Sequence, residues 1–372
     1  MSHAKYMAQA IKLARQGWYT TRPNPRVGCV LVRDGQVVGQ GAHLKAGEPH
    51  AEVHALRQAG ELAQGADAYV TLEPCSHYGR TPPCAEALIK AGVRQVFVGM
   101  QDPNPLVAGR GVALLEAAAI PVVTNLLEDQ ARALNPGFIQ RMQTGRPRVV
   151  AKQAMSLDGR TAMASGESQW ITGPAARADV QRLRAESCAV ITGIDSLLAD
   201  DSRLNVRAPE WSDHPDFTQP LRVVLDSQLR TPVQAAIFQQ PGSTLVLTSQ
   251  AALEQKIAQV KALEAEGAEV VGIPLAETGS LDLQAVLDLL GQRQCNQVLV
   301  EAGARLTGAF MQQRLIDELW LYLAPKFLGH AARGLLHLPG LDSLAACPEM
   351  QVIDLRCLGD DWRFQLRPAA SY

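Results

Sequence analysis

One histidine and two cysteines near the start of the chain are suited to binding zinc. His50 lies in GEPHAEVHAL, and Cys75 and Cys84 lie in LEPCSHYGRTPPC, where each cysteine directly follows a proline. Zinc prefers neutral imidazole and thiolate ligands, and a catalytic zinc ion leaves its fourth position open for water. Helices expected to begin near His50 and at Cys84 would direct partly positive N-termini at this point, which favours thiolate. These side chains therefore predict an open site for one zinc ion per chain.

Glu52 follows the predicted histidine ligand by two residues and is a candidate for moving a proton. Water bound to zinc loses a proton near neutral pH, and a nearby carboxylate can accept that proton and pass it to a leaving amine. His-Ala-Glu followed by Pro-Cys matches the signature of zinc-dependent nucleobase deaminases, although eight residues rather than two separate the cysteines. A closed structural zinc site, with His54 or His77 as fourth ligand, is an alternative. A disulfide is the least favoured interpretation, because seven cysteines in a chain without a recognisable signal peptide indicate reduced thiols.

The elements that must position these residues alternate between strand and helix. Asp34-Gly35 lies between two apolar runs and predicts a β-hairpin over 27–42. Helices are expected from His50 and over 83–92, with a buried strand over 68–74 between them. Glycine and proline then interrupt the pattern at 145–147, so we expect a boundary between domains 1–146 and 147–372. The second domain alternates in the same way, with seven strands expected and helices between most of them, for example over 174–185 and 251–266. Both domains are therefore expected to be α/β.

The composition limits the kinds of partner that we expect. The 372 residues carry a formal net charge of −2 at pH 7, and 5% of them are aromatic, which disfavours a nucleic-acid-binding surface. No apolar run is long enough to span a membrane, and reduced cysteines are typical of the cytoplasm. We therefore expect a cytoplasmic protein that acts on a small molecule and has no nucleic-acid or membrane partner.

Several longer stretches resemble a known enzyme family. TRPNPRVG, HLKAGEPHAE and EPCSHYGRTPPC are similar to the deaminase domain of the bifunctional deaminase–reductase family of riboflavin biosynthesis, which has the same eight-residue insert between its cysteines. KQAMSLDGRTA, SGESQWITG and VEAGARLTGAF resemble the reductase domain of that family. The resemblance covers nearly the whole chain. It implies an N-terminal cytidine-deaminase-like three-layer domain, a C-terminal dihydrofolate-reductase-like α/β domain, and a dimer or tetramer of identical chains.

The resemblance also implies two successive reactions and their cofactors. The first domain would use zinc to remove the 2-amino group of 2,5-diamino-6-(5-phosphoribosylamino)pyrimidin-4-one as ammonia, and the second would use NADPH to reduce the ribosyl side chain to ribityl. By motif, the zinc ligands are His50, Cys75 and Cys84, and the proton carrier is Glu52. Positions that match substrate contacts are Asn24, His43, His77, Ser168, Arg184, Leu204, Arg207 and Glu301. Positions that match cofactor contacts are Ala154, Trp170, Ser196, Asp200, Gly303, Ala304, Arg305, Leu306, Thr307 and Gly308.

The residues of the second domain, taken by themselves, indicate less. No Gly-x-Gly-x-x-Gly pattern follows a strand, but Glu301-Ala302-Gly303 ends an apolar strand and leads into a helix. Such a turn can present backbone N–H groups to a phosphate, or it can be an ordinary strand-to-helix connection. Ala302 and Ser202 replace a glycine and a proline that are common in the family. Two other functions stay open: a tRNA- or nucleobase-editing zinc deaminase with an accessory domain, and a zinc-stabilised binding module.

Overall fold

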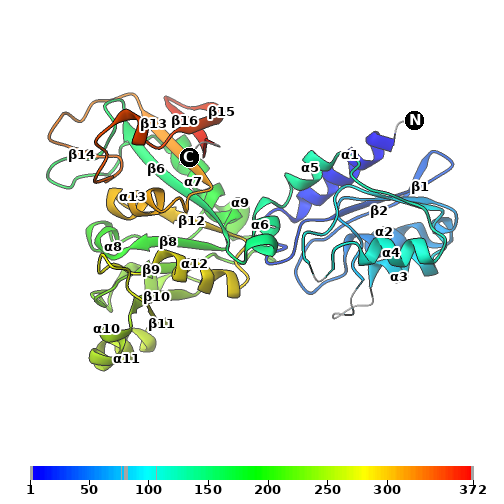
Figure 1. The fold of residues 1–372 in the computed structure, drawn as a ribbon, viewed down its shortest axis with the longest axis horizontal. Helices are drawn as coiled ribbons and strands as arrows, with labels where there is room; N and C mark the ends of the chain where they lie inside the picture. Colours follow the sequence, from blue (N-terminus) through cyan, green and yellow to red (C-terminus); the bar gives the residue numbers. More distant parts are fainter. Residues whose placement is uncertain (1–2, 77, 79–82, 106, 370–372) are drawn as a thin grey trace. The chain divides into compact units, whose positions relative to one another are not determined.

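The chain forms two compact units, Met1–Gly145 and Arg146–Tyr372 (Figure 1). The structure, a computed structural model, describes residues 3–76, 78, 83–105 and 107–369. Each unit is a sheet with helices packed on it, and the buried apolar side chains of each unit form clusters of their own.

The first unit is built on a five-stranded sheet in the order β2-β1-β3-β4-β5. β1 runs antiparallel to β2 and β3, whereas β3, β4 and β5 are parallel. Asp34 and Gly35 have φ angles of 52° and 78°, as a type I′ turn requires, which confirms the predicted hairpin. The strands are β1 (Gly28–Arg33), β2 (Gln36–Ala42), β3 (Asp67–Val70), β4 (Gln95–Val98) and β5 (Val122–Val123).

Helices lie on both faces of this sheet and give the three layers that were expected. Cys29 and Leu31 of β1 pack with α2, α3 and α4, whereas Val30 and Val32 point to the other face and pack with α1. The face that carries α2 and α3 is the one on which the candidate zinc ligands meet. The helices are α1 (His3–Ala14), α2 (Ala51–Ala59), α3 (Cys84–Lys90), α4 (Arg110–Ala117), α5 (Glu128–Arg132) and α6 (Pro136–Thr144), with short 3-10 turns at Arg15–Gly17 and Gly60–Ala63.

The second unit is built on a nine-stranded sheet in the order β11-β10-β9-β8-β12-β6-β13-β16-β15. The strands from β11 to β13 are all parallel, and the hairpin of β15 and β16 adds two antiparallel strands beside β13. The strands are β6 (Arg148–Ser156), β8 (Ala189–Gly193), β9 (Leu221–Leu225), β10 (Thr244–Ser249), β11 (Ala268–Ile273), β12 (Gln297–Glu301), β13 (Glu318–Ala324), β15 (Met350–Leu358) and β16 (Asp361–Pro368). A separate two-stranded ribbon pairs β7 (Arg160–Ala162) with β14 (Arg333–Gly334).

Helices cover both faces of the nine-stranded sheet as well. Val149 and Ala151 of β6 pack with α12 and α13, while Val150 packs on the opposite face with α7, α8 and α11. Because the parallel strands all end at the same edge, the loops that follow them gather there, which is where ligands bind in such sheets. None of the described helices combines the length and the apolar character that crossing a bilayer requires. The helices are α7 (Pro174–Glu186), α8 (Ile194–Asp200), α9 (Pro209–Ser212), α10 (Gln250–Gln255), α11 (Ile257–Ala265), α12 (Leu283–Gln292) and α13 (Ala304–Gln312), with 3-10 turns at Ala236–Gln239 and Leu344–Ala346.

Candidate active sites

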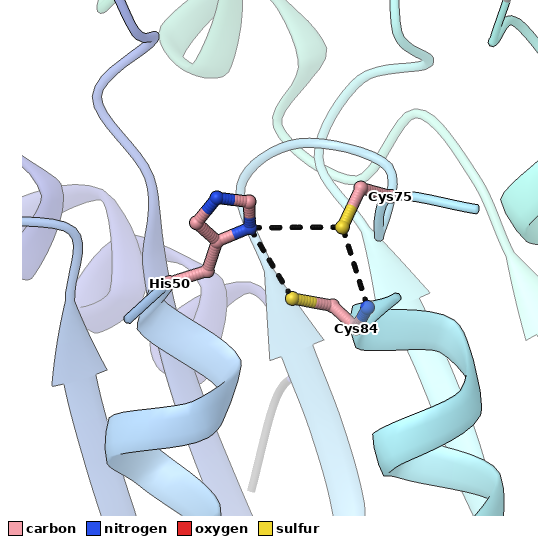
Figure 2. Close-up of side chains that lie close together, drawn as sticks. All are labelled: His50, Cys75 and Cys84. Atoms are coloured by element: carbon pink, nitrogen blue, oxygen red, sulfur yellow. Dashed lines mark hydrogen bonds between the residues drawn. The ribbon is translucent and has the colours of Figure 1, made fainter. Parts of the chain in front are cut away.

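The three predicted zinc ligands meet in the first unit (Figure 2). His50 is the residue before α2, in extended conformation, and Cys84 is the first residue of α3. Cys75 was expected at the end of a strand, but β3 ends at Val70 and the cysteine lies in the loop that follows. Two helix N-termini therefore adjoin the cluster, as the sequence predicted.

The distances within this cluster fit a tetrahedral zinc ion. The Nδ1 atom of His50 lies 3.6 Å from the sulfur of Cys75 and 3.4 Å from that of Cys84. Zinc–nitrogen and zinc–sulfur bonds of ordinary length at a tetrahedral angle would place such ligand atoms about 3.5 Å apart. The cluster of possible metal ligands in the described residues holds these three side chains and not His54. An open three-ligand site is thus the better fit than a closed one with His54, while His77 lies outside the described residues.

The thiols of Cys75 and Cys84 lie close together, and this shifts their pKa values in opposite directions. The thiol and backbone N–H of Cys84, together with His50, lower the pKa of Cys75 to about 4 by hydrogen bonding. The backbone N–H of Cys84 donates to the sulfur of Cys75 over 3.3 Å. The same shared hydrogen bond and burial raise the pKa of Cys84. At neutral pH the pair thus holds at least one thiolate, which is the form that binds a metal.

Glu52 is placed beside this cluster by the first turn of α2 and is only 3% exposed. Burial, followed by the charge of Cys75, raises the pKa of its carboxyl group to about 7. Its Oε2 atom has no hydrogen-bond partner among the described residues. A buried carboxyl group that titrates near neutral pH can both accept and donate a proton, as a general acid–base catalyst must.

Asn24 and His43 form a chain of hydrogen bonds next to His50. The Nδ1 atom of His43 lies 3.2 Å from the carbonyl oxygen of Pro49, which can only accept, so Nδ1 carries the proton. The Nε2 atom of the neutral ring then accepts from the Nδ2 atom of Asn24 over 3.0 Å. His43 is 2% exposed and both its nitrogens are occupied, whereas the amide oxygen of the half-buried Asn24 has no partner among the described residues and can accept from another molecule.

A buried glutamate that sequence reasoning missed fixes the loop that carries Cys75. Glu73 is 3% exposed, and its two oxygens accept four backbone N–H groups, from Asp102, Gly109, Gly111 and Val112, over 2.9 to 3.2 Å. Two of these donors belong to the first turn of α4, whose N–H groups have no partner within the helix. A Cβ atom on Gly111 would lie 2.0 Å from the carbonyl oxygen of Pro74, so only glycine permits this approach. The only indication in the sequence was an acidic residue inside an otherwise apolar segment.

A cavity of about 2040 Å³ opens in the second unit at the carboxyl ends of the parallel strands. Drug-sized ligands occupy roughly 300–1,000 Å³, so this cavity has room for two molecules side by side. It brings together most of the residues that the resemblance implied. They are Ala154, Ser168, Trp170, Arg184, Ser196, Asp200, Leu204, Arg207, Glu301, Gly303, Ala304, Arg305 and Leu306.

Arg184 and Glu301 form a buried ion pair at the wall of the cavity. The Nε and Nη2 atoms of Arg184, on α7, lie 2.5 and 2.9 Å from the two carboxylate oxygens of Glu301, at the end of β12. The remaining Nη1 atom donates to the carbonyl oxygen of Asn205 over 3.1 Å. Although burial raises the pKa of Glu301, the charge of Arg184 more than offsets it and lowers that pKa.

The turn between β12 and α13 presents backbone to the cavity. The N–H of Gly303 donates to the hydroxyl oxygen of Ser196 over 3.1 Å, so α8 and the start of α13 are joined there. The backbone does not require glycine at position 302, because Ala302 is not among the residues with positive φ. Thr307 and Gly308 lie outside the cavity lining. Thr307 is buried and bonded to Gln153, and Gly308 packs on the backbone of His337, so their cofactor contact stays a prediction.

Other residues of the cavity wall were missed by sequence reasoning. Lys152, half-buried on β6, lies near Glu301, Arg184 and Asp200, and burial lowers its pKa. A lysine inside the apolar run RVVAKQA was the available signal. Arg203, Ser227 and Arg230 also line the cavity, and sequence reasoning singled out none of the three. Trp170, in contrast, is 63% exposed and lies under the guanidinium group of Arg177, so it is not a core residue.

Comparison with known proteins agrees with both halves of this description. A family profile described as the cytidine and deoxycytidylate deaminase zinc-binding region matches residues 1–100, and one described as the RibD C-terminal domain matches residues 147–364. The riboflavin biosynthesis protein RibD of Escherichia coli is 52% identical over 97% of this chain and 98% of its own length.

Solved structures give the same result. A structure of Acinetobacter baumannii RibD is 50% identical, with a TM-score of 0.91 over 98% of each chain. A Thermotoga maritima protein, named as a diaminohydroxyphosphoribosylaminopyrimidine deaminase/5-amino-6-(5-phosphoribosylamino)uracil reductase, is 30% identical, with a TM-score of 0.84 over 98% of each chain. The fold, the zinc-ligand cluster and these matches over nearly the full length place the chain in the RibD family of riboflavin biosynthesis proteins.

Proposed function

We propose that this chain catalyses both reactions for which the Thermotoga relative is named, deamination first and reduction second. Residues 1–146 would form the deaminase domain and residues 147–372 the reductase domain. The observation that carries this proposal is a His-Cys-Cys cluster beside a buried Glu52 in one unit, with a cavity for two molecules in the other. The substrate is the diaminopyrimidine that bears a phosphoribosylamino group.

In the deaminase domain, His50, Cys75 and Cys84 hold zinc, which supplies Lewis acidity for hydrolysis when it is bound. Glu52 takes a proton from the attacking water and delivers it to the leaving 2-amino group. One water is consumed, a carbon–oxygen bond replaces the carbon–nitrogen bond, and ammonia leaves. Asn24 accepts a hydrogen bond from an N–H group of the pyrimidine, since its amide oxygen is the free end of the chain through His43.

In the reductase domain, NADPH supplies the hydride and the protein supplies position and charge. Trp170, Ser196, Asp200 and the turn at Gly303 bind the cofactor, with the N-terminus of α13 near its phosphates. Ser168, Leu204, Arg207 and the Arg184–Glu301 pair surround the ribosyl chain of the substrate. When the ribose ring opens, its C1 forms an imine with the amino nitrogen; C1 then accepts the hydride and the nitrogen accepts a proton, which gives the ribityl group.

The chain is also proposed to be cytoplasmic and to form homo-oligomers. All seven cysteines are free thiols, as a reducing compartment requires. The edge strand β15 exposes Val352, Ile353 and Leu355, which a second copy of the chain could cover.

A coupled assay tests the proposed function. Ammonia release from the enzymatically generated diaminopyrimidine phosphate is followed first, and NADPH oxidation after it. Glu52→Gln should retain zinc and NADPH oxidation with supplied uracil intermediate, but lose ammonia release by at least about a hundredfold. Wild-type ammonia release in this variant would refute the role of Glu52, and NADPH oxidation without any deaminated intermediate would refute the order of the two steps.

A further inference from the structure

The loop that brings Trp170 to the cavity of the second unit has little apolar burial to hold it. It spans residues 163–173, between β7 and α7, and contributes Ser168 and Trp170 to the cavity lining. None of its residues is buried, and Trp170 itself is 63% exposed. Fixing such a segment costs conformational entropy, which polar contacts must offset where apolar burial is small.

Two charged side chains from the nine-stranded sheet hold the backbone of this loop. Lys326, two residues after the end of β13, donates from Nζ to the carbonyl oxygen of Trp170 over 3.2 Å. Asp361, the first residue of β16, accepts the backbone N–H of Gly173 on Oδ2 over 2.6 Å. Because β13 and β16 are antiparallel neighbours, the end of one and the start of the other lie at the same edge of the sheet. The two ends of the segment Trp170–Gly173 are thus bonded to one rigid support.

Asp361 also takes the place of a missing N-cap on α7. The residue at the N-cap position is Gly173, which has no side chain that could accept a hydrogen bond, and Pro174 after it has no N–H. Asp361 is 3% exposed, and its carboxyl group lies at this end of the 13-residue helix. The N-terminus of a helix carries a partial positive charge, which an acidic side chain stabilises. Asp361 therefore fixes the point at which the loop becomes helix.

The first turn of α7 in turn holds the Trp170 ring. The guanidinium group of Arg177 lies 4.6 Å from the centroid of that ring, and its Nη1 atom donates to the carbonyl oxygen of Thr172 over 2.7 Å. Since Arg177 belongs to the turn that begins beside Asp361, the place of its guanidinium group depends on where α7 starts. The orientation of Trp170 toward the cavity is thus set by contacts outside the cavity.

We propose that Asp361 and Lys326 are positioning residues of the reductase, which hold the loop 163–173 in place and so present Trp170 to the nicotinamide cofactor. Neither side chain is among those that line the cavity, so both act through the loop. This inference rests on the proposed reductase function, in which Trp170 contacts NADPH. It extends the cofactor site to the edge of the sheet formed by β13 and β16.

NADPH binding and steady-state kinetics of Asp361→Ala test the proposal. Loss of the bond to Gly173 should lower the fraction of molecules with the loop in place to between about a tenth and a third, which raises the Kd and the KM for NADPH about three- to tenfold. The kcat should stay within about twofold of wild type, because Asp361 touches no reacting atom. Asp361→Asn should recover part of the loss, because its amide oxygen can still accept from Gly173.

A second variant and a control accompany this substitution. Lys326→Met removes the other bond at an exposed position, so it should raise the KM for NADPH even if Asp361→Ala unfolds the second unit. Asp360→Asn, a change at the exposed residue next to Asp361, is the matched control and should behave as wild type.

Two further measurements separate positioning from a general loss of stability. Amides of 163–173 should exchange hydrogen faster in Asp361→Ala and Lys326→Met, while those of β6 and β12 should match the control. In a Trp170→Ala background, Asp361→Ala should have no further effect on the KM for NADPH, because the ring that it positions is gone. A full effect in that background, or an unchanged KM for NADPH in both variants, overturns the proposal. A wild-type chain that binds no NADPH would instead refute the proposed function, and this inference with it.

Discussion

Glu73→Gln should destabilise the first unit selectively, although it changes a single atom far from any exposed surface. Each oxygen of Glu73 accepts two backbone N–H groups, Oε2 from Asp102 and Gly109 and Oε1 from Gly111 and Val112. A glutamine amide has one oxygen and one NH₂ group, so in either orientation two backbone donors would face another donor.

The size of the effect follows from this count. A hydrogen bond to a charged group contributes about 1.5–3 kcal/mol, and Glu73 is too buried for water to replace the lost bonds. Losing two of the four bonds should therefore lower the free energy of unfolding of the first unit by about 3–6 kcal/mol. Because Cys75 follows two residues later, the affinity for zinc should fall as well, while NADPH oxidation by the second unit should not change.

Hydrogen exchange followed by mass spectrometry is the direct assay, since it reads the amides of 102 and 109–112 separately from those of the second unit. Urea unfolding and zinc content measured on the same samples give the free energy and the effect on the metal. Glu116→Gln, an exposed change on the same helix α4, is the matched control. The reasoning is refuted if Glu73→Gln lowers the unfolding free energy by less than about 1 kcal/mol, or if exchange at 109–112 matches the control.

Two further predictions concern one unit each. His43→Ala should raise the KM for the diaminopyrimidine about 2- to 10-fold at unchanged zinc content, because it frees the amide of Asn24 to rotate. His43→Gln should recover part of this loss, because its amide oxygen can accept the hydrogen bond in place of Nε2. Loss of zinc with an unchanged KM would contradict this role. Asp179→Asn should make the stability of the second unit depend less on pH in the acid range. Burial raises the pKa of Asp179, but the hydrogen bond from Arg363 and the charge of Arg182 outweigh it and hold that pKa below its usual value of about 3.9. The stability that this carboxylate contributes is thus present above about pH 4 and lost as the pH falls through the folded-state pKa, so urea midpoints measured at stepwise lower pH should fall less steeply in the variant.

The sequence predicted the elements whose residues have a strong local signal. Asp34-Gly35 specified the hairpin, and Pro83 specified the start of the helix that carries Cys84. The seven strands expected in the second domain correspond to β6, β8, β9, β10, β11, β12 and β13. The α/β fold of both domains and the deaminase–reductase family are confirmed by the comparisons.

What the sequence did not show depends on contacts between distant segments. The hairpin of β15 and β16 was missed, although β15 contains apolar residues such as Val352, Ile353 and Leu355, which the structure leaves exposed on an edge strand. One helix expected over 251–266 is two, α10 and α11, because Lys256 leaves helical conformation between them. The bonds of Glu73 and the pairing of Arg184 with Glu301 join residues 29 to 117 positions apart, and no local pattern encodes such a partner.

The separate cores of the two units have a consequence for the balance between the two activities. No cluster of buried apolar residues in the described ranges contains members from both units. A substitution in one core therefore changes the folding equilibrium of that unit without weakening the packing of the other. The peptide bond between residues 145 and 146 nevertheless guarantees one copy of each unit per translated chain. The ratio of the two units is thus fixed at one to one by translation, while substitutions can change the stability of each unit separately.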